Sequence, residues 1–172
     1  MQSSSRALTH PEFAERARKV RLLAIDFDGV MTDNYVYVSE DGTEVVRCSR
    51  LEGYGLRRAM AAGVHCVIIS TEENPVVSAR ARKLKIACHQ GVEDKVAALE
   101  ALLSEHGFGF QDAAFIGNDI NDLGVLGKVH LPVIVADAHE DLDTLTAFRT
   151  LKPGGQGAVR EVCDAIAAAK GG

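Results

Sequence analysis

Two carboxylates, Asp26 and Asp28, flank Phe27 where the apolar segment 20–27 ends. Carboxylates this close at the end of a buried strand repel each other unless a cation or a hydrogen-bond network shares their charge. A divalent metal ion would do so, and a carboxylate held there could serve as a nucleophile or as a general acid and base. Asp33 adds a third acid that could hold the turn.

Other polar residues that could do chemistry also follow apolar segments or begin a helical one. Ser70 and Thr71 end a second apolar segment, Lys95 begins a helical pattern, and the run GNDIND at 117–122 follows a third apolar segment. The last residue of that run, Asp122, could orient Lys95 or cap the next helix. Each position is one at which a parallel α/β sheet presents ligands.

The segments between these residues show which elements must position them. Near-continuous apolar runs predict strands buried on both faces, at 20–27, 64–70, 113–118 and 131–137. Helical periodicity lies between and after them, at 54–62, 75–85, 94–107 and 158–170. This alternation predicts an α/β fold with a doubly wound, Rossmann-like parallel sheet, whose ligand site lies at the carboxyl ends of the strands.

The segment 34–49 interrupts the alternation of strand and helix. Apolar and polar residues alternate there on both sides of Asp41-Gly42, which is a strong β-hairpin signal. Only this hairpin and one helix fit between Asp28 and Ser70, so we expect no cap domain. The whole chain, 1–172, is expected to form a single domain with its core at about 20–170.

Composition excludes several classes of function. The chain has 172 residues, of which 47% are hydrophobic and 25% charged, as is typical of one globular domain. Its net charge of −5, without a basic block, argues against nucleic acid and anionic membranes as partners. No apolar stretch approaches the ~20 residues that span a bilayer, and the start has no secretion signal, so we expect a cytoplasmic protein. The cysteines are dispersed and are expected to be ordinary thiols; they are Cys48, Cys66, Cys88 and Cys163.

The motifs together resemble the haloacid dehalogenase superfamily of phosphatases. They are D-x-D-G-V-x-T-D at 26–33, the strand-end Ser70, Lys95, and G-N-D-x-x-D at 117–122, in that order. The hairpin resembles that of the capless subfamily, which contains 3-deoxy-D-manno-octulosonate 8-phosphate phosphatase and relatives acting on acylneuraminate or nonulosonate 9-phosphates. Three more motifs carry this likeness, G-Y-G-L at 53–56, A-D-A-H at 136–139 and G-G-Q-G-A-V-R-E at 154–161.

The resemblance implies a Mg²⁺-dependent phosphomonoesterase that acts through an aspartyl phosphate. Asp26 would be the nucleophile and Asp28 the general acid and base, while Ser70 and Lys95 would hold the transferring oxygens. Asp26 and the backbone carbonyl of Asp28 would bind Mg²⁺. Most relatives carry an Asp directly after the glycine of the last motif, where this chain has Asn118, so both Asn118 and Asp119 are candidates for the remaining ligand.

The same resemblance bears on the substrate, which is expected to be a 2-keto-3-deoxy sugar acid phosphate. Octulosonate phosphatases carry Gly-Arg after the motif Ser or Thr, whereas this chain has Thr71-Glu72. Glu72, together with Lys83 on the following helix, is similar to the variants that act on nonulosonate 9-phosphates. The substrate is therefore expected to be a nonulosonate 9-phosphate, with octulosonate 8-phosphate as the alternative.

The resemblance also implies a homotetramer. Its hairpins would form a central barrel, and each C-terminal segment would reach a neighbour's site, where Gly155, Gln156 and Arg160 would contact the substrate. One alternative is a catalytically silent oligomerisation module, like the related domain fused to some sugar-acid cytidylyltransferases. Another is a signalling receiver domain, which the D-x-D spacing, the last motif and the hairpin do not suit.

Overall fold

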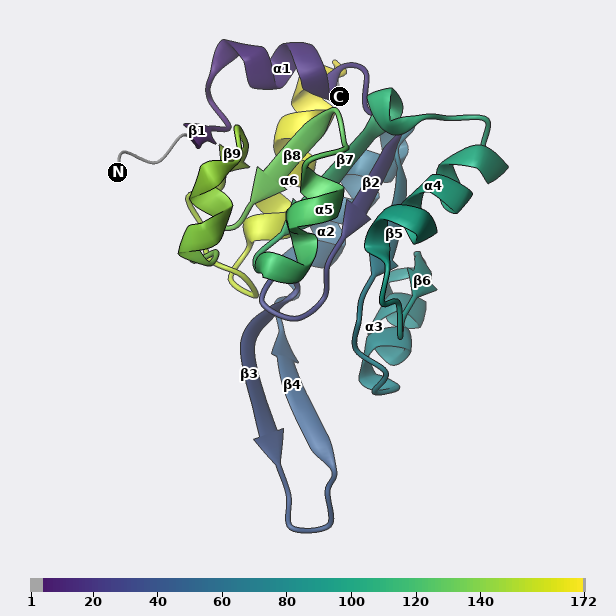
Figure 1. The fold of residues 1–172 in the computed structure, drawn as a ribbon, viewed down its shortest axis with the longest axis vertical. Coiled ribbons are helices and arrows are strands. Elements are labelled where there is room, and N and C mark those ends of the chain that lie inside the picture. Colours follow the sequence, from purple (N-terminus) through teal and green to yellow (C-terminus); the bar gives the residue numbers. More distant parts are fainter. Residues whose placement is uncertain (1–4, 172) are drawn as a thin grey trace.

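A computed structural model describes residues 5–171, so residues 1–4 and 172 of the predicted domain lie outside the described part. Its centre is a seven-stranded parallel sheet in the order β1-β9-β8-β7-β2-β5-β6, which confirms the predicted α/β fold (Figure 1). The strands are β1 (Arg6–Ala7), β2 (Leu22–Ile25), β5 (His65–Ile69), β6 (Ala87–His89), β7 (Ala113–Gly117), β8 (Leu131–Ile134) and β9 (Phe148–Arg149).

Helices cover both faces of the sheet. On one face, α1 (Pro11–Ala17), α2 (Leu51–Ala61), α3 (Val76–Leu84) and α6 (Ala158–Ala169) enclose one buried apolar cluster, and on the other α4 (Lys95–Glu105) and α5 (Leu123–Leu126) enclose a second. Successive residues of β2 alternate between the clusters, since Leu23 and Ile25 belong to the first and Leu22 and Ala24 to the second. A strand covered on both faces is therefore apolar throughout.

The hairpin is the one antiparallel element in the described chain, a separate two-stranded sheet of β3 (Thr32–Val38) and β4 (Glu44–Cys48). It projects from the end of the molecule at which β2 ends (Figure 1). At its base the Asp33 carboxylate accepts hydrogen bonds from Arg47 Nε at 2.8 Å and from the Tyr35 backbone N–H at 3.3 Å. Only β3 and β4 lie between β2 and α2, so residues 5–171 contain no cap domain, as predicted.

The short connections include three 3₁₀ turns, Phe110–Asp112, Ile120–Asp122 and Glu140–Thr144. No helix in the described residues is long and apolar enough to cross a membrane.

The segment before α6 packs against the loop that follows β2. The Gly155 backbone N–H donates to the carbonyl oxygen of Val30 at 2.9 Å. A Cβ atom added to Gly154 would lie 1.8 Å from the carbonyl oxygen of Gly29, so only glycine fits at this contact. The loop that carries Asp28 therefore rests on a backbone segment from the far end of the sequence.

The variant Gly154→Ala is expected to lower the free energy of unfolding by about 2 kcal/mol, because the methyl group must displace the backbone of the loop after β2. Urea unfolding followed by circular dichroism measures this change. Gly124→Ala is the matched control. Gly124 lies in helix α5, and a Cβ there meets only Val96 Cγ2, at 3.5 Å. Equal stability of the two variants would contradict the close packing described here.

Candidate active site

A buried ion triad lies at the carboxyl end of the central strands. Asp26 directly follows β2, and Lys95 is the first residue of α4. The Lys95 ammonium lies 2.9 Å from Asp26 Oδ1 and 2.7 Å from Asp122 Oδ1. All three residues are buried. Of the two roles that the sequence left open for Asp122, the structure has the first: its carboxylate contacts Lys95, and it accepts the Asn118 backbone N–H at 2.9 Å but makes no capping hydrogen bond to α5.

The triad carries more negative than positive charge. Burial, and then the negative charge of Asp122, raises the pKa of Asp26 to about 7, and the Lys95 ammonium opposes that rise. Burial alone would lower the pKa of Lys95, but the carboxylates of Asp26 and Asp122 outweigh it and the net shift is upward. Burial also raises the pKa of Asp28, with Glu72 adding to the rise. A further cation would relieve this excess of carboxylates.

The oxygen atoms around Asn118 have the spacing of a cation site. With its Nδ2 turned toward them, the Asn118 amide donates to the carbonyl oxygen of Asp28 at 3.0 Å and to Asp26 Oδ2 at 3.3 Å. With Oδ1 in that place, three oxygen atoms face one another. Adjacent ligands of an octahedral Mg²⁺ ion lie about 2.9 Å apart, because each Mg–O distance is about 2.0–2.1 Å. Asp26, Asn118 and the Asp28 carbonyl could therefore hold Mg²⁺.

Asp119 takes a different position from Asn118. Its carboxylate accepts the Ile120 backbone N–H at 2.7 Å and caps the 3₁₀ turn 120–122. No group of three or more His, Cys, Asp or Glu residues in the described chain is arranged to hold a metal ion. The candidate metal site differs from such groups because it uses one carboxylate, one amide and one backbone carbonyl.

Two cavities meet at Asp28. The first, of about 330 Å³, is lined by Asp26, Asp28, Asn34, Thr71, Asn118, Asp119, Ile120 and Asn121. Asp28 and Asn34 also line the second cavity, so the two are contiguous. Ser70 is buried behind Thr71, and its hydroxyl accepts the Glu72 backbone N–H at 3.1 Å. The predicted residues Asp26, Asp28, Ser70, Lys95 and Thr71 thus converge at one end of the sheet.

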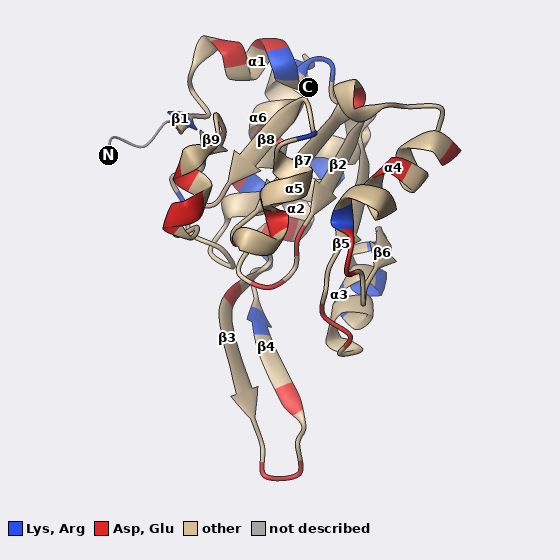
Figure 2. Ribbon diagram, in the orientation of Figure 1, with Lys and Arg blue, Asp and Glu red and all other residues tan. Residues whose placement is uncertain are grey.

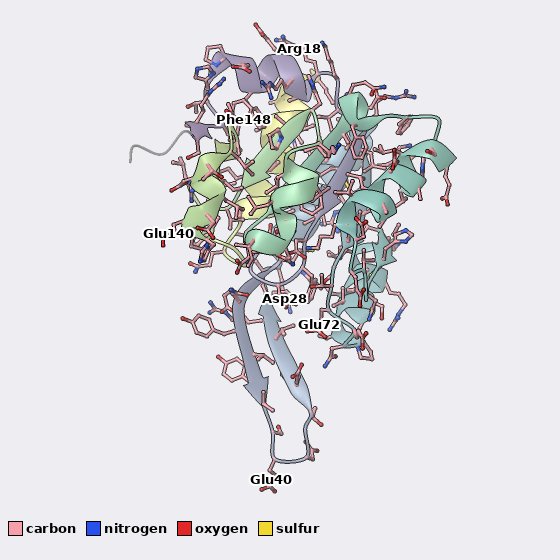
Figure 3. The ribbon with its side chains drawn as sticks, viewed as in Figure 1. Arg18, Asp28, Glu40, Glu72, Glu140 and Phe148 are labelled. Atoms are coloured by element: carbon pink, nitrogen blue, oxygen red, sulfur yellow. The ribbon has the colours of Figure 1, made fainter. Side chains whose placement is uncertain are left out.

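The second cavity, of about 200 Å³, lies between the hairpin and the loop after β5. Glu72 lines it, beside Asp28 at the base of the hairpin (Figure 3). Glu44 of the hairpin lines the opposite side and accepts a hydrogen bond from Asn74 Nδ2 at 3.1 Å. Acidic residues colour the end of the molecule from which the hairpin projects (Figure 2). This cavity therefore presents acceptors, and it suits a ligand rich in hydroxyl groups.

Four other predicted substrate residues lie apart from these cavities in a single chain. Lys83 lines a basic cavity of about 370 Å³ together with Arg50, Arg57 and Arg80. Gly155 is buried against the backbone of the loop after β2, and Gln156 is exposed. The Arg160 guanidinium is paired with Asp164 Oδ2 at 2.6 Å. Lys83, Gly155, Gln156 and Arg160 line neither cavity beside Asp28.

Several residues that shape the site were not among those predicted from the sequence. Asn34 lines both cavities from a left-handed backbone position with φ 66°, and Glu44 and Asn74 close the second cavity. Glu52 is fully buried and accepts two backbone hydrogen bonds. Glu52 lies just before the predicted helix 54–62, since α2 begins three residues earlier than the periodicity indicated, so its burial had no signal in the sequence. Glu44 gave no signal, since it reads as the polar face of a hairpin.

Comparison with known proteins gives a consistent result. No protein-family model matches the chain. It is 36% identical over 162 residues, 94% of this chain and 86% of the relative, to the 3-deoxy-D-manno-octulosonate 8-phosphate phosphatase KdsC of Salmonella typhimurium.

Two solved structures are also similar. A Legionella pneumophila protein assigned to subfamily III A of the HAD superfamily hydrolases has a TM-score of 0.90 at 36% identity, covering 93% of this chain and 88% of that one. The 3-deoxy-D-manno-octulosonate 8-phosphate phosphatase of Moraxella catarrhalis, solved with magnesium ion, phosphate ion and KDO, has a TM-score of 0.89 at 32% identity, covering 93% and 92%. At this identity over almost its whole length, the chain belongs to the 3-deoxy-D-manno-octulosonate 8-phosphate phosphatase family of the HAD superfamily.

Proposed function

We propose that this phosphatase hydrolyses the phosphate ester of a 2-keto-3-deoxy sugar acid through an aspartyl phosphate on Asp26. The observation that carries the proposal is the buried triad Asp26–Lys95–Asp122, of which Asp26 lines the same cavity as Asp28 and Asn118. The Moraxella catarrhalis relative, solved with magnesium, phosphate and KDO, supports the class of substrate. We therefore place the phosphate in the first cavity and the sugar in the second.

In the first step, an Asp26 carboxylate oxygen attacks phosphorus and the bond between phosphorus and the sugar oxygen breaks. Asp28 gives a proton to that leaving oxygen. Burial and Glu72 raise the pKa of Asp28, which favours the protonated form that this step needs. Lys95 neutralises charge on the transferring oxygens, and Ser70 and Thr71 contact them from the next strand end.

In the second step, Asp28 takes a proton from water, and the water oxygen attacks phosphorus of the aspartyl phosphate. The bond between phosphorus and Asp26 breaks, which releases inorganic phosphate and restores the carboxylate. One residue thus acts first as acid and then as base. The position of Asp28, which lines both cavities, lets it reach the leaving oxygen and the water.

Mg²⁺ would be held by Asp26, Asn118 and the carbonyl of Asp28, where it supplies positive charge against the repulsion between a carboxylate and a phosphate dianion. Asn118 contributes no charge to this set. We therefore assign Asn118, and not Asp119, as the third protein ligand, because the Asp119 carboxylate is occupied with the Ile120 N–H.

We propose a nonulosonate 9-phosphate over 3-deoxy-octulosonate 8-phosphate, because Glu72 stands where octulosonate phosphatases carry Arg and makes the second cavity acidic. Glu72 and Glu44 accept hydrogen bonds from hydroxyl groups but repel a carboxylate, so the sugar carboxylate must lie outside this cavity. Lys83, in the basic cavity with Arg50, Arg57 and Arg80, is proposed to bind it. Because that cavity is separate from Asp28 within one chain, the carboxylate reaches it only if two copies adjoin.

We further propose that the protein is a homotetramer assembled through the hairpin. Tyr35, Tyr37 and Val38 are 75%, 66% and 63% exposed, an apolar surface that calls for a partner. Second copies of the chain are the proposed cover. Gln156 is exposed on the C-terminal segment and is the predicted substrate residue there that can reach a neighbour's site.

A silent oligomerisation module is the alternative function. The observation that favours it is the neutral Asn118, which stands where most relatives carry an Asp. A domain without catalysis does not need a buried ion triad, since replacing such a cluster with apolar residues is often neutral or stabilising. The complete triad therefore favours the phosphatase.

Asp26→Asn is expected to lower kcat at least about 10³-fold, because an amide cannot form the aspartyl phosphate. Phosphate release with Mg²⁺ from a nonulosonate 9-phosphate and from 3-deoxy-octulosonate 8-phosphate measures it, and the first is expected to have the higher kcat/KM. Asp119→Asn, in the same cavity, is the control and should stay within about tenfold of wild type. Residual Asp26→Asn activity within about tenfold would exclude Asp26 as the nucleophile, and no release by the folded wild type would favour the silent module.

Asn118→Asp is expected to lower the Mg²⁺ concentration that gives half-maximal rate, because a charged ligand binds the ion more tightly. Titration of the rate with Mg²⁺ measures the change. Asn121→Asp adds the same charge to the same cavity and should have a smaller effect. An equal shift in both variants would mean that Asn118 acts through the general field and does not bind the ion.

The double variant Tyr37→Lys and Val45→Glu is expected to reduce the mass in solution from four chains to one. Tyr37 and Val45 face each other across the hairpin, so the new ion pair keeps the hairpin while it removes the apolar surface. Light scattering after gel filtration measures the mass. The change Leu151→Glu, at a residue that is 80% exposed outside the hairpin, is the control. A monomeric wild type would contradict the assembly.

A further inference from the structure

Glu52 is a buried carboxylate in the first turn of α2 that the proposed reaction does not use. Its side chain is fully buried. Oε1 accepts the backbone N–H of Gly157 at 3.1 Å, and Oε2 accepts that of Arg160 at 2.7 Å. Burial raises the pKa of Glu52 to about 7, and the two N–H groups oppose the rise. Burying a carboxylate costs free energy unless hydrogen bonds compensate, so these contacts indicate a role beyond packing.

Glu52 replaces a cap that α6 lacks. Gly157 occupies the N-cap position of α6 at φ 106° and has no side chain to accept the N–H groups of the first turn. From a different helix, the carboxylate of Glu52 accepts one of them, that of Arg160, together with the N–H of Gly157 itself. Its negative charge also suits the positive end of the helix dipole. The start of α6 is therefore fixed to the start of α2.

The segment just before Gly157 carries this constraint to the catalytic loop. Gly154 and Gly155 lie against the backbone of 29–33, with the Gly155 N–H bonded to the Val30 carbonyl at 2.9 Å. The Gly154 N–H also donates to Asp137 Oδ1 at 2.9 Å, which fixes this segment to the end of β8. The loop 29–33 follows Asp28 directly, so its placement decides where the Asp28 carboxyl lies relative to Asp26.

We propose that Glu52 is a positioning residue for Asp28, acting through the start of α6 and the glycine segment 154–155. The inference rests on the proposed role of Asp28 as the general acid. If α6 shifts, the loop 29–33 loses its support and Asp28 moves relative to the leaving oxygen. Asp26 and Lys95 keep their places, because each is held by a sheet strand or by α4 and not by α6.

This separation predicts a selective defect. A sugar phosphate needs Asp28 to protonate its alkoxide, whereas p-nitrophenyl phosphate releases a phenolate that leaves without a proton. Glu52→Gln is therefore expected to slow the first step, measured as the pre-steady-state release of the leaving group, about 10- to 100-fold for the sugar acid phosphate and less than about threefold for p-nitrophenyl phosphate. The second step, in which Asp28 activates water, is common to both substrates and slows equally. KM should change little, since Asp26 and Lys95 stay in place. Both substrates are compared at saturating Mg²⁺, because a shift of Asp28 also moves its carbonyl, one of the proposed metal ligands.

Glu161→Gln is the matched control. The Glu161 carboxylate also belongs to the first turn of α6 and accepts the backbone N–H groups of Leu151 at 3.0 Å and Lys152 at 3.1 Å. Its loss removes the same charge and a comparable set of hydrogen bonds without touching the contact with Gly157 and Arg160. In this variant, the ratio of the first-step rates on the two substrates should stay at the wild-type value, even if the variant is less stable.

The outcomes distinguish failure of the positioning role of Glu52 from failure of the proposed phosphatase function. Equal losses in the first step on both substrates, or no loss in that step, in folded Glu52→Gln would overturn the positioning role while leaving the proposed function intact. A wild type that hydrolyses neither substrate would instead overturn the proposed function. If Glu52→Gln does not fold, Glu52→Asp keeps the charge on a shorter side chain; it should show the same selectivity to a smaller degree, and an unchanged ratio in it would overturn the inference.

Discussion

The ammonium group of Lys95, held between two buried carboxylates, is the interaction on which the rest of the site depends. It lies 2.9 Å from Asp26 and 2.7 Å from Asp122, and removal of one partner from such a buried cluster costs about 3–5 kcal/mol. It also links the carboxyl ends of two neighbouring strands, since Asp26 follows β2 while Asp122 lies in the turn after β7. The ends of these two strands are therefore held together by charge at the proposed phosphate site.

The same cluster explains how the proposed metal site could do without a set of acidic ligands. One lysine does not balance Asp26, Asp122 and the nearby Asp28, so the site retains negative charge when Asn118 replaces a carboxylate. A neutral amide at this point limits the repulsion among the carboxylates and still offers oxygen to a hard cation. The acidic cavity lined by Glu72 and Glu44 adds further negative charge. A phosphate ester can therefore bind here only where Lys95 and a metal ion offset these carboxylates.

The sequence predicted the fold, and the residues that meet at one end of its sheet, because both depend on local patterns. Apolar runs marked the four buried strands, and the motifs named Asp26, Asp28, Ser70 and Lys95, which the sheet brings together. The patterns could not reveal β1 and β9, which have two residues each and too few side chains for a period. They also could not place Lys83 or Arg160, whose surroundings come from distant segments. Glu44 and Glu52 act through contacts across the chain, and no spacing in the sequence encodes such contacts.

The glycine segment before α6 has a consequence for how the protein is made. The sheet strands and the residues Asp26, Ser70 and Lys95 all precede it, yet the loop that carries Asp28 is supported only after 154–160 has docked. During synthesis, a chain that has built its whole parallel sheet still lacks this support. Catalytic competence therefore arrives last, with the closing helix, and a ribosome-bound intermediate can be folded at its centre without being an enzyme.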